Sequence, residues 1–134
     1  MNREWEKVKQ FHIHFGVPYK ETPSLLTSDR VQKRAHWMMD EIREFQEAKT
    51  LEDQADAMID VIYFALGTLV EMGVKPQELF DIVHEANMAK LWEDGKPRHR
   101  ETDGKIIKPP TWKDPHPKLR EAIHKQEANR QPLR

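Results

Sequence analysis

Two pairs of acidic residues, spaced as neighbours on a helix, are the part of this sequence best suited to chemistry. Glu41 and Glu44 lie three residues apart, and Asp56 and Asp60 lie four apart, so each pair shares one helical face. If the two helices pack antiparallel, the carboxylates can meet. An all-oxygen site favours Mg²⁺, with Mn²⁺ as the second choice, over zinc. The spacing therefore predicts a divalent metal site, with Asp53 on the same face as a further candidate ligand.

The sequence after these acids explains why they would need a cation. Residues 61–70 carry no charged side chain, so this half of the helix is expected to be buried on all sides. Carboxylates that lead into a buried segment cost free energy unless a positive charge compensates them. Surface acids need no such compensation, and we expect Asp40, Glu47 and Glu52 to be of that ordinary kind.

Apolar periodicity and capping residues predict the helices that position the acids. Asn2 is expected to cap the first helix, Ser28 or Asp29 the second, and Gly73 to end the third. No stretch alternates long enough for a core strand, so we predict an all-α, four-helix-bundle-type fold. The expected helices cover residues 2–15, 28–49, 51–72 and 76–92. The second helix carries an apolar stripe, expected to face the core, of Val31, Ala35, Met38, Ile42 and Phe45.

The character of the sequence changes after Trp92. Residues 93–117 contain two Asp-Gly pairs and five prolines, a composition that predicts a small hairpin or an ordered loop. A short polar helix is expected from about residue 117, and the tail ANRQPLR is expected to be disordered. We therefore predict one domain over residues 1–116 with this turn-rich extension, followed by a polar helix and tail over residues 117–134.

Length and composition exclude several classes of protein. A chain of 134 residues is sufficient for one domain. The net charge of −1 provides no field that would attract nucleic acid or an anionic membrane. The absence of cysteine excludes disulfides and thiolate zinc sites. Because no signal-like or membrane-spanning apolar stretch is present, we expect a cytoplasmic protein with no nucleic-acid or membrane partner.

Around the acidic pairs the sequence resembles the all-α nucleoside triphosphate pyrophosphohydrolases. This superfamily includes MazG-like enzymes, dimeric dUTPases, dCTP pyrophosphatases and phosphoribosyl-ATP pyrophosphohydrolase, and its hallmark is E-x-x-E on one helix and E-x-x-D on the next. Glu41-Ile42-Arg43-Glu44 matches the first half, and Asp60-Val61-Ile62-Tyr63 resembles the end of the second. The resemblance extends from about Phe11 to Trp112, and the segments NMAKLWEDGK and TDGKIIKPPTW are closest to the phosphoribosyl-ATP pyrophosphohydrolase-like branch.

The second half of the motif departs from the family pattern. The glutamate that precedes the aspartate in the family falls on Ala57, and the nearest acid is Asp56. Asp53-x-x-Asp56 is an alternative register. Whether Asp53 or Asp60 completes the site with Asp56 therefore stays open.

The resemblance implies a reaction and a set of binding residues. Members of the superfamily cleave nucleoside triphosphates between the α and β phosphates, giving a monophosphate and pyrophosphate, with Mg²⁺ held by carboxylates. Glu44 is then expected to contact the attacking water or to take its proton. Members have a similar N-x-x-K, which implies that Lys90 binds phosphate and that Asn87 is a polar contact. Lys105 and Lys108 of the turn-rich segment are predicted to close over the phosphates.

The same resemblance implies a base-binding wall and an oligomer. Trp37 lies on the flank of its helix that carries Glu41 and Glu44, so it is predicted to stack on a base near the metal, and His12 is a further candidate contact. Packing in the core is the alternative for each aromatic side chain. Members of the family form dimers or tetramers, so we expect at least a homodimer.

Two questions stay open from the sequence. The nucleotide substrate is not encoded in a recognisable way. The absence of a glutamate at Ala57 also keeps an alternative alive, in which the chain is a non-catalytic helical interaction or accessory protein that retains a degenerate metal site.

Overall fold

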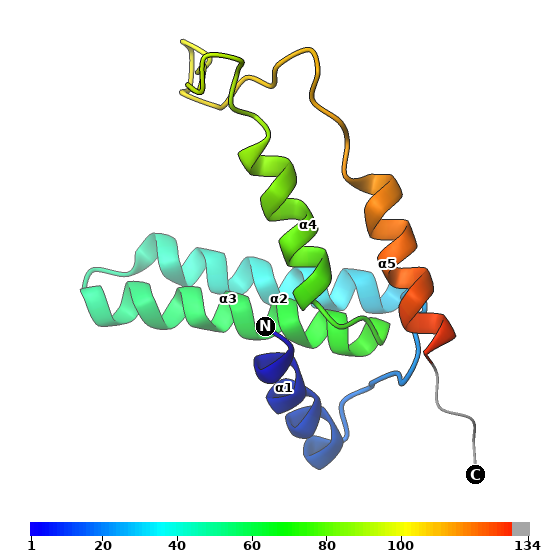
Figure 1. Cartoon of the computed structure of the whole chain (residues 1–134). Helices are drawn as coiled ribbons and strands as arrows, with labels where there is room; N and C mark the ends of the chain where they lie inside the picture. Colours follow the sequence, from blue (N-terminus) through cyan, green and yellow to red (C-terminus); the bar gives the residue numbers. More distant parts are fainter. Residues whose placement is uncertain (130–134) are drawn as a thin grey trace. The chain divides into compact units, whose positions relative to one another are not determined.

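The computed structural model describes residues 1–129, and its regular structure consists of helices (Figure 1). Within these residues the only extended pairing is an isolated antiparallel bridge between His99 and Ile106. The predicted all-α class is confirmed. Of the tail expected to be disordered, Ala128 instead belongs to the last helix, and residues 130–134 lie outside the described residues. The helices are α1 (Asn2–Phe15), α2 (Ser28–Glu47), α3 (Leu51–Met72), α4 (Gln77–Met88) and α5 (His116–Ala128).

Two compact units make up the chain. The first comprises Met1–Pro76 together with the chain from Gln126 onward, and the second comprises Gln77–Lys125. In the first unit α3 packs against both α1 and α2, and α2 and α3 run side by side as an antiparallel pair (Figure 1). A small apolar core, formed by Trp5, Val8, Leu66 and Val70, joins α1 to α3.

Short polar residues set the helix ends, although not always the ones predicted. The side chain of Thr27 caps α2 by accepting from the backbone N–H of Arg30, and Thr50 caps α3 in the same way. The predicted caps of α2, Ser28 and Asp29, instead lie within its first turn. Met1, rather than Asn2, precedes α1, and no side chain caps it. Gly73 ends α3 as predicted, with a φ of 68° that a side chain would disfavour.

The apolar face predicted for α2 is only partly covered in the single chain, where Ala35 and Met38 are half-buried. Val31, Ile42 and Phe45 are 45%, 46% and 38% exposed, whereas Arg34 is 3% exposed. On α3, Ile62 is 48% exposed, so residues 61–70 are buried on one side rather than on all sides. Helical periodicity identifies an apolar face, but it does not say which neighbour covers that face.

The second unit holds α4, the turn-rich segment and most of α5. Both Asp-Gly pairs form turns with a positive φ at glycine, at Gly95 and Gly104, and the second lies between the bridged residues His99 and Ile106. The prediction of a small hairpin is confirmed in this local sense. The fourth helix ends at Met88, earlier than predicted. Among the described helices, no single one is long and apolar enough to cross a membrane, and α3 and α4 meet the test of length and composition only when taken together.

Candidate functional site

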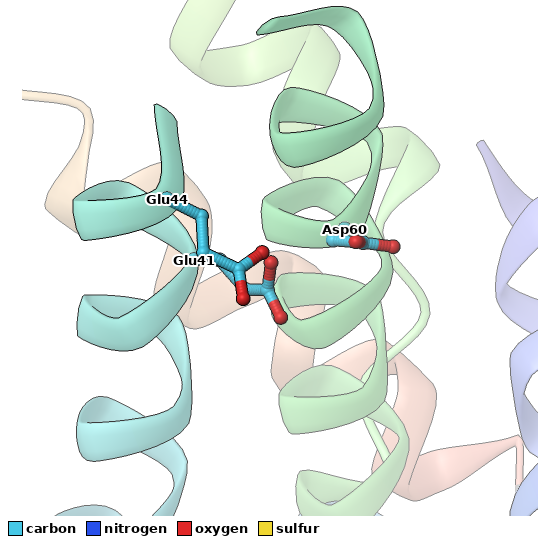
Figure 2. Close-up of side chains that lie close together, drawn as sticks. All are labelled: Glu41, Glu44 and Asp60. Atoms are coloured by element: carbon cyan, nitrogen blue, oxygen red, sulfur yellow. The ribbon is translucent and has the colours of Figure 1, made fainter. Parts of the chain in front are cut away.

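Three acidic side chains converge between α2 and α3. Glu41 and Glu44 extend from α2 toward α3, which carries Asp60 (Figure 2). One carboxylate oxygen of each residue lies within 4.8 Å of those of the other two. Asp56 lies one turn earlier on α3, is exposed and falls outside this group, as does the exposed Asp53. The structure thus brings together both residues of the first predicted pair and one residue of the second.

The three carboxylates form an electrostatically strained group. Burial raises the pKa of Glu41 to about 7, helped by a hydrogen bond to Glu44 and by the charges of Glu44, Asp60 and Asp56. Burial, then the charges of Asp56 and Glu44, raise the pKa of Asp60, and a hydrogen bond with Glu41 opposes that rise. The Oε2 atom of Glu41 is buried and has no hydrogen-bond partner. A bound cation would both satisfy this oxygen and compensate the charges, so the donor set fits Mg²⁺ or Mn²⁺.

A mainly apolar pocket of about 460 Å³ adjoins the acidic group. Two pairs of aromatic rings line it. Phe11 and Tyr63 contact each other edge to face, with ring centroids 5.7 Å apart, and the rings of Trp37 and Phe64 are tilted, with centroids 6.1 Å apart. These walls could enclose a flat ring. The predicted base contacts Trp37 and His12 both line it. The full lining is Phe11, His12, Val17, Arg34, Trp37, Glu41, Asp60, Tyr63 and Phe64.

His12, which lines this pocket, is held in one tautomer. Its Nδ1 lies 2.8 Å from the carbonyl oxygen of Pro18, and because a carbonyl only accepts, Nδ1 carries the proton. Burial lowers the pKa of His12, which is 3% exposed, so the ring is neutral near pH 7. The Nε2 atom of the neutral ring is therefore a hydrogen-bond acceptor.

Arg34 lines the pocket but was not among the site residues predicted from the sequence. Its Nε donates to Thr68 Oγ1 at 3.1 Å and its Nη2 to the carbonyl of Phe64 at 2.9 Å. Its Nη1 lies 3.1 Å from the carboxylate of Glu71. Its spacing in the sequence could have indicated this position. Arg34 precedes Trp37 by three residues and Glu41 by seven, so it shares their helical face.

The predicted phosphate-binding residues lie in the second unit. Asn87 is exposed on α4, and Lys90 lies just after the helix, in a turn. The ammonium groups of Lys90 and Lys108 both lie over the ring of Trp112, at 5.8 and 4.3 Å from its centroid. Lys105 lies in the hairpin, where its backbone carbonyl accepts from the N–H of Arg100.

Comparison with known proteins identifies the family. A model of the family described as phosphoribosyl-ATP pyrophosphohydrolase matches residues 8–87, which is more than half of the chain. The chain belongs to the phosphoribosyl-ATP pyrophosphohydrolase family. The resemblance drawn from the sequence is therefore confirmed, and the protein is a hydrolase of the class that acts on pyrophosphate bonds.

One solved structure extends the match over nearly the whole chain. The crystal structure of a candidate NTP pyrophosphohydrolase from Exiguobacterium sp. 255-15 is 31% identical in sequence, with a TM-score of 0.53. The match covers 93% of this phosphoribosyl-ATP pyrophosphohydrolase family member and 96% of that chain. No curated protein matches the sequence. The acidic group and the aromatic pocket both fall within the residues matched by the family model.

Proposed function

We propose that this protein is a divalent-metal-dependent nucleoside triphosphate pyrophosphohydrolase. It would break the bond between the α and β phosphates by adding water, giving a nucleoside monophosphate and pyrophosphate. The observation that supports this most directly is the meeting of Glu41, Glu44 and Asp60, in which Glu41 Oε2 is buried without a partner. A cytoplasmic location and the lack of nucleic-acid and membrane partners stay predictions from composition.

The acidic residues take different parts in this proposal. Glu41, Glu44 and Asp60, with Asp56 as a nearby fourth candidate, would hold Mg²⁺, which supplies charge neutralisation for the phosphates and a more acidic water. Glu44 is the most exposed of the three converging acids, so its carboxylate is accessible to accept a proton from the attacking water. Mn²⁺ suits the same oxygen donors.

The aromatic pocket is the proposed site for the base. Trp37 would stack on the base, and Nε2 of His12 would accept a hydrogen bond from one of its N–H groups. In the second unit, Lys90, Lys105 and Lys108 are proposed phosphate contacts, with Asn87 as a polar contact. Cationic groups are needed because a triphosphate carries about four negative charges that the carboxylates would repel.

We also propose that the protein is a homodimer or a tetramer. Large apolar side chains on α2 and α3 are exposed in the single chain, and contiguous apolar surface of this kind is typical of protein interfaces. Light scattering should therefore give a mass of at least twice 15.9 kDa, and a monomer of that mass would contradict the proposal. The exposed apolar residues of these helices include Val31, Met39, Ile42, Phe45, Ile59 and Ile62.

A pyrophosphate-release panel tests the activity. It would cover canonical and damaged deoxynucleoside triphosphates, each with Mg²⁺ and with Mn²⁺. We expect release from at least one substrate and its loss in Glu44→Gln. Glu47→Gln is the matched control, because Glu47 is also an exposed glutamate of α2 but lies outside the acidic group.

One observation supports the non-catalytic alternative. Ala57, where the family has a glutamate, is 2% exposed, so no carboxylate occupies this buried position of α3. A protein with a degenerate site would still bind the metal but would release no pyrophosphate from any member of the panel. Activity abolished by Glu44→Gln would exclude that alternative.

A further inference from the structure

Trp112 joins the turn-rich segment to the end of α4. Its indole Nε1 donates to the carbonyl of Ala86 at 2.7 Å. Within a continuing helix that carbonyl would accept from Lys90 N, which instead donates to Asn87 O at 3.2 Å because the helix has ended. The indole thus takes up a carbonyl that the end of the helix leaves without its helical partner. The side chain of Trp112 is partly buried, as expected for a side chain that connects two segments.

Two lysines from different segments meet at the same indole ring. Lys108 precedes Trp112 in the turn-rich segment, and its Nζ lies 4.3 Å from the ring centroid. Lys90 follows α4, and its Nζ lies 5.8 Å from that centroid. Each contact is within the range of a cation–π interaction. Both ammonium groups therefore lie within 5.8 Å of one ring centroid, although their residues are 18 positions apart in the sequence.

These two charges lack a carboxylate partner. Across residues 1–129, no ion pair involves Lys90 or Lys108, whereas Lys9 pairs with Glu21 at 2.9 Å. Asp114 of the same segment pairs with neither lysine in the described residues; its Oδ1 accepts from the backbone N–H of His116 at 2.7 Å. Two unpaired ammonium groups at one ring repel each other and attract an anion with several charges. A chain of phosphates has that character.

We propose that Trp112 is a positioning residue that holds Lys108 beside Lys90, so that the two ammonium groups form one binding site for a polyphosphate chain. The identification of that chain with the phosphates of the substrate rests on the proposed function. The site itself requires only the geometry at the indole. Trp112 does not touch the phosphates; it acts through the two lysines.

Binding of inorganic tripolyphosphate to the full-length protein, measured by calorimetry at low and at high salt, tests this assignment. Lys108→Gln should weaken binding by on the order of tenfold, as expected for one lost charged contact, and should reduce its salt dependence. Trp112→Ala should weaken binding equally, and adding Lys108→Gln to it should cause little further loss. Trp112→Phe keeps a ring under the lysines and should restore part of the affinity.

Trp92 provides the matched control. It lies in the same segment, its Nε1 donates to the carbonyl of Ile107 at 3.0 Å, and the guanidinium of Arg98 lies over its ring at 4.0 Å. It therefore resembles Trp112 in anchoring and in its cation contact, but it holds no lysine. Trp92→Phe should leave tripolyphosphate affinity unchanged.

The outcomes separate this assignment from the proposed function. Folded Trp112→Ala that binds tripolyphosphate as tightly as the parent protein would overturn the assignment, and so would an additive loss with Lys108→Gln. If Trp112→Ala does not fold, Trp112→Phe and Lys108→Gln still decide, because unchanged affinity in both would overturn it. If the binding results are as expected but no nucleotide is hydrolysed, the proposed function fails while the polyphosphate site stands.

Discussion

Arg30 of α2 donates two parallel hydrogen bonds to Glu71 of α3, from Nε to Oε1 at 2.8 Å and from Nη2 to Oε2 at 2.9 Å. Glu71 is 2% exposed, and Nη1 of Arg34 lies 3.1 Å from the same Oε2. Both guanidinium groups also lie over the ring of Trp37, at 5.6 and 5.3 Å. One buried carboxylate therefore fixes the two helices relative to each other and supports a wall of the proposed base pocket.

Removal of this carboxylate should destabilise the fold strongly. Glu71→Gln leaves two arginines without their counter-charge, one of them buried, and breaking such a pair costs about 3–5 kcal/mol in the free energy of unfolding. Urea denaturation would measure the loss. Glu21→Gln removes the partner of Lys9, an exposed pair at 2.9 Å, and should cost less than about 1 kcal/mol. Equal losses in the two variants would show that the buried network contributes no more to the free energy of unfolding than an exposed ion pair does.

A methyl group at Gly67 should disturb the same network. A Cβ there would lie 2.3 Å from Arg34 Nη2 and 2.9 Å from His12 Nε2. Arg34 cannot easily move away, because it is buried and hydrogen-bonded at three nitrogens. Gly67→Ala should therefore destabilise the protein by about 1–3 kcal/mol, against the stabilisation of about 1 kcal/mol expected for alanine in a helix.

An exposed alanine of the same helix provides the reference for this experiment. Ala55→Gly should cost only the propensity term, about 1 kcal/mol. Thermal unfolding of both variants would separate the steric cost at Gly67 from the difference in helix propensity between glycine and alanine. A Gly67→Ala variant more stable than the parent would mean that the space between α2 and α3 is larger than the structure shows.

Divalent metal should stabilise the protein through the acidic group. Mg²⁺ or Mn²⁺ that binds the folded state alone raises Tm, by mass action. Glu41→Gln should raise Tm without metal, since it removes a strained charge, and should abolish most of the shift with metal. Glu47→Gln should keep the full shift. If the Tm of the parent protein responds to neither metal, the proposal that these carboxylates bind a divalent cation is wrong.

The stability of the metal-free protein should fall as pH rises from about 4.5 to 7. The pKa of Glu41 is raised from 4.5 to about 7, so the folded state holds this proton more tightly than the unfolded state across that interval. The unfolded chain then releases its proton first, which lowers the free energy of unfolding as pH increases. Urea denaturation of the parent and of Glu41→Gln across this interval would test it, with a flatter profile expected for the variant.

Saturating Mg²⁺ should reverse this pH dependence. A bound cation favours ionised carboxylates, so metal affinity should increase as pH rises through 7 and a proton should be released on binding. Calorimetry in buffers of different ionisation enthalpy would detect that proton. Metal affinity that does not change between pH 6 and pH 8 would exclude Glu41 as a ligand with the pKa given above.

Much of the secondary structure could be predicted from local signals. The third helix was expected over residues 51–72 with Gly73 after it, and α3 has these bounds because caps and glycine act within one helical turn. The E-x-x-E spacing likewise placed Glu41 and Glu44 on one face, which holds wherever that helix lies. The class of the fold and the family were therefore available from the sequence, and so was the helical face that Glu41 and Glu44 share.

The rest depended on how α2 and α3 pack. Spacing alone left Asp53, Asp56 and Asp60 equivalent on one helical face, and the register between the helices selects Asp60 to meet Glu41 and Glu44. That register is held by contacts between residues 30 to 41 positions apart in sequence, such as those of Arg34 with Phe64 and of Arg30 with Glu71. No local pattern reports on contacts of that range.

The sequence by itself determined which side chains could share a helical face, because that periodicity is a property of the local backbone. It could not determine which face would be covered, and the apolar stripe of α2 is left partly uncovered, with Ile42 46% exposed, whereas Arg34 is buried. Only the tertiary structure decided this, since the burial of an arginine depends on a carboxylate, Glu71, that a different helix must bring to it.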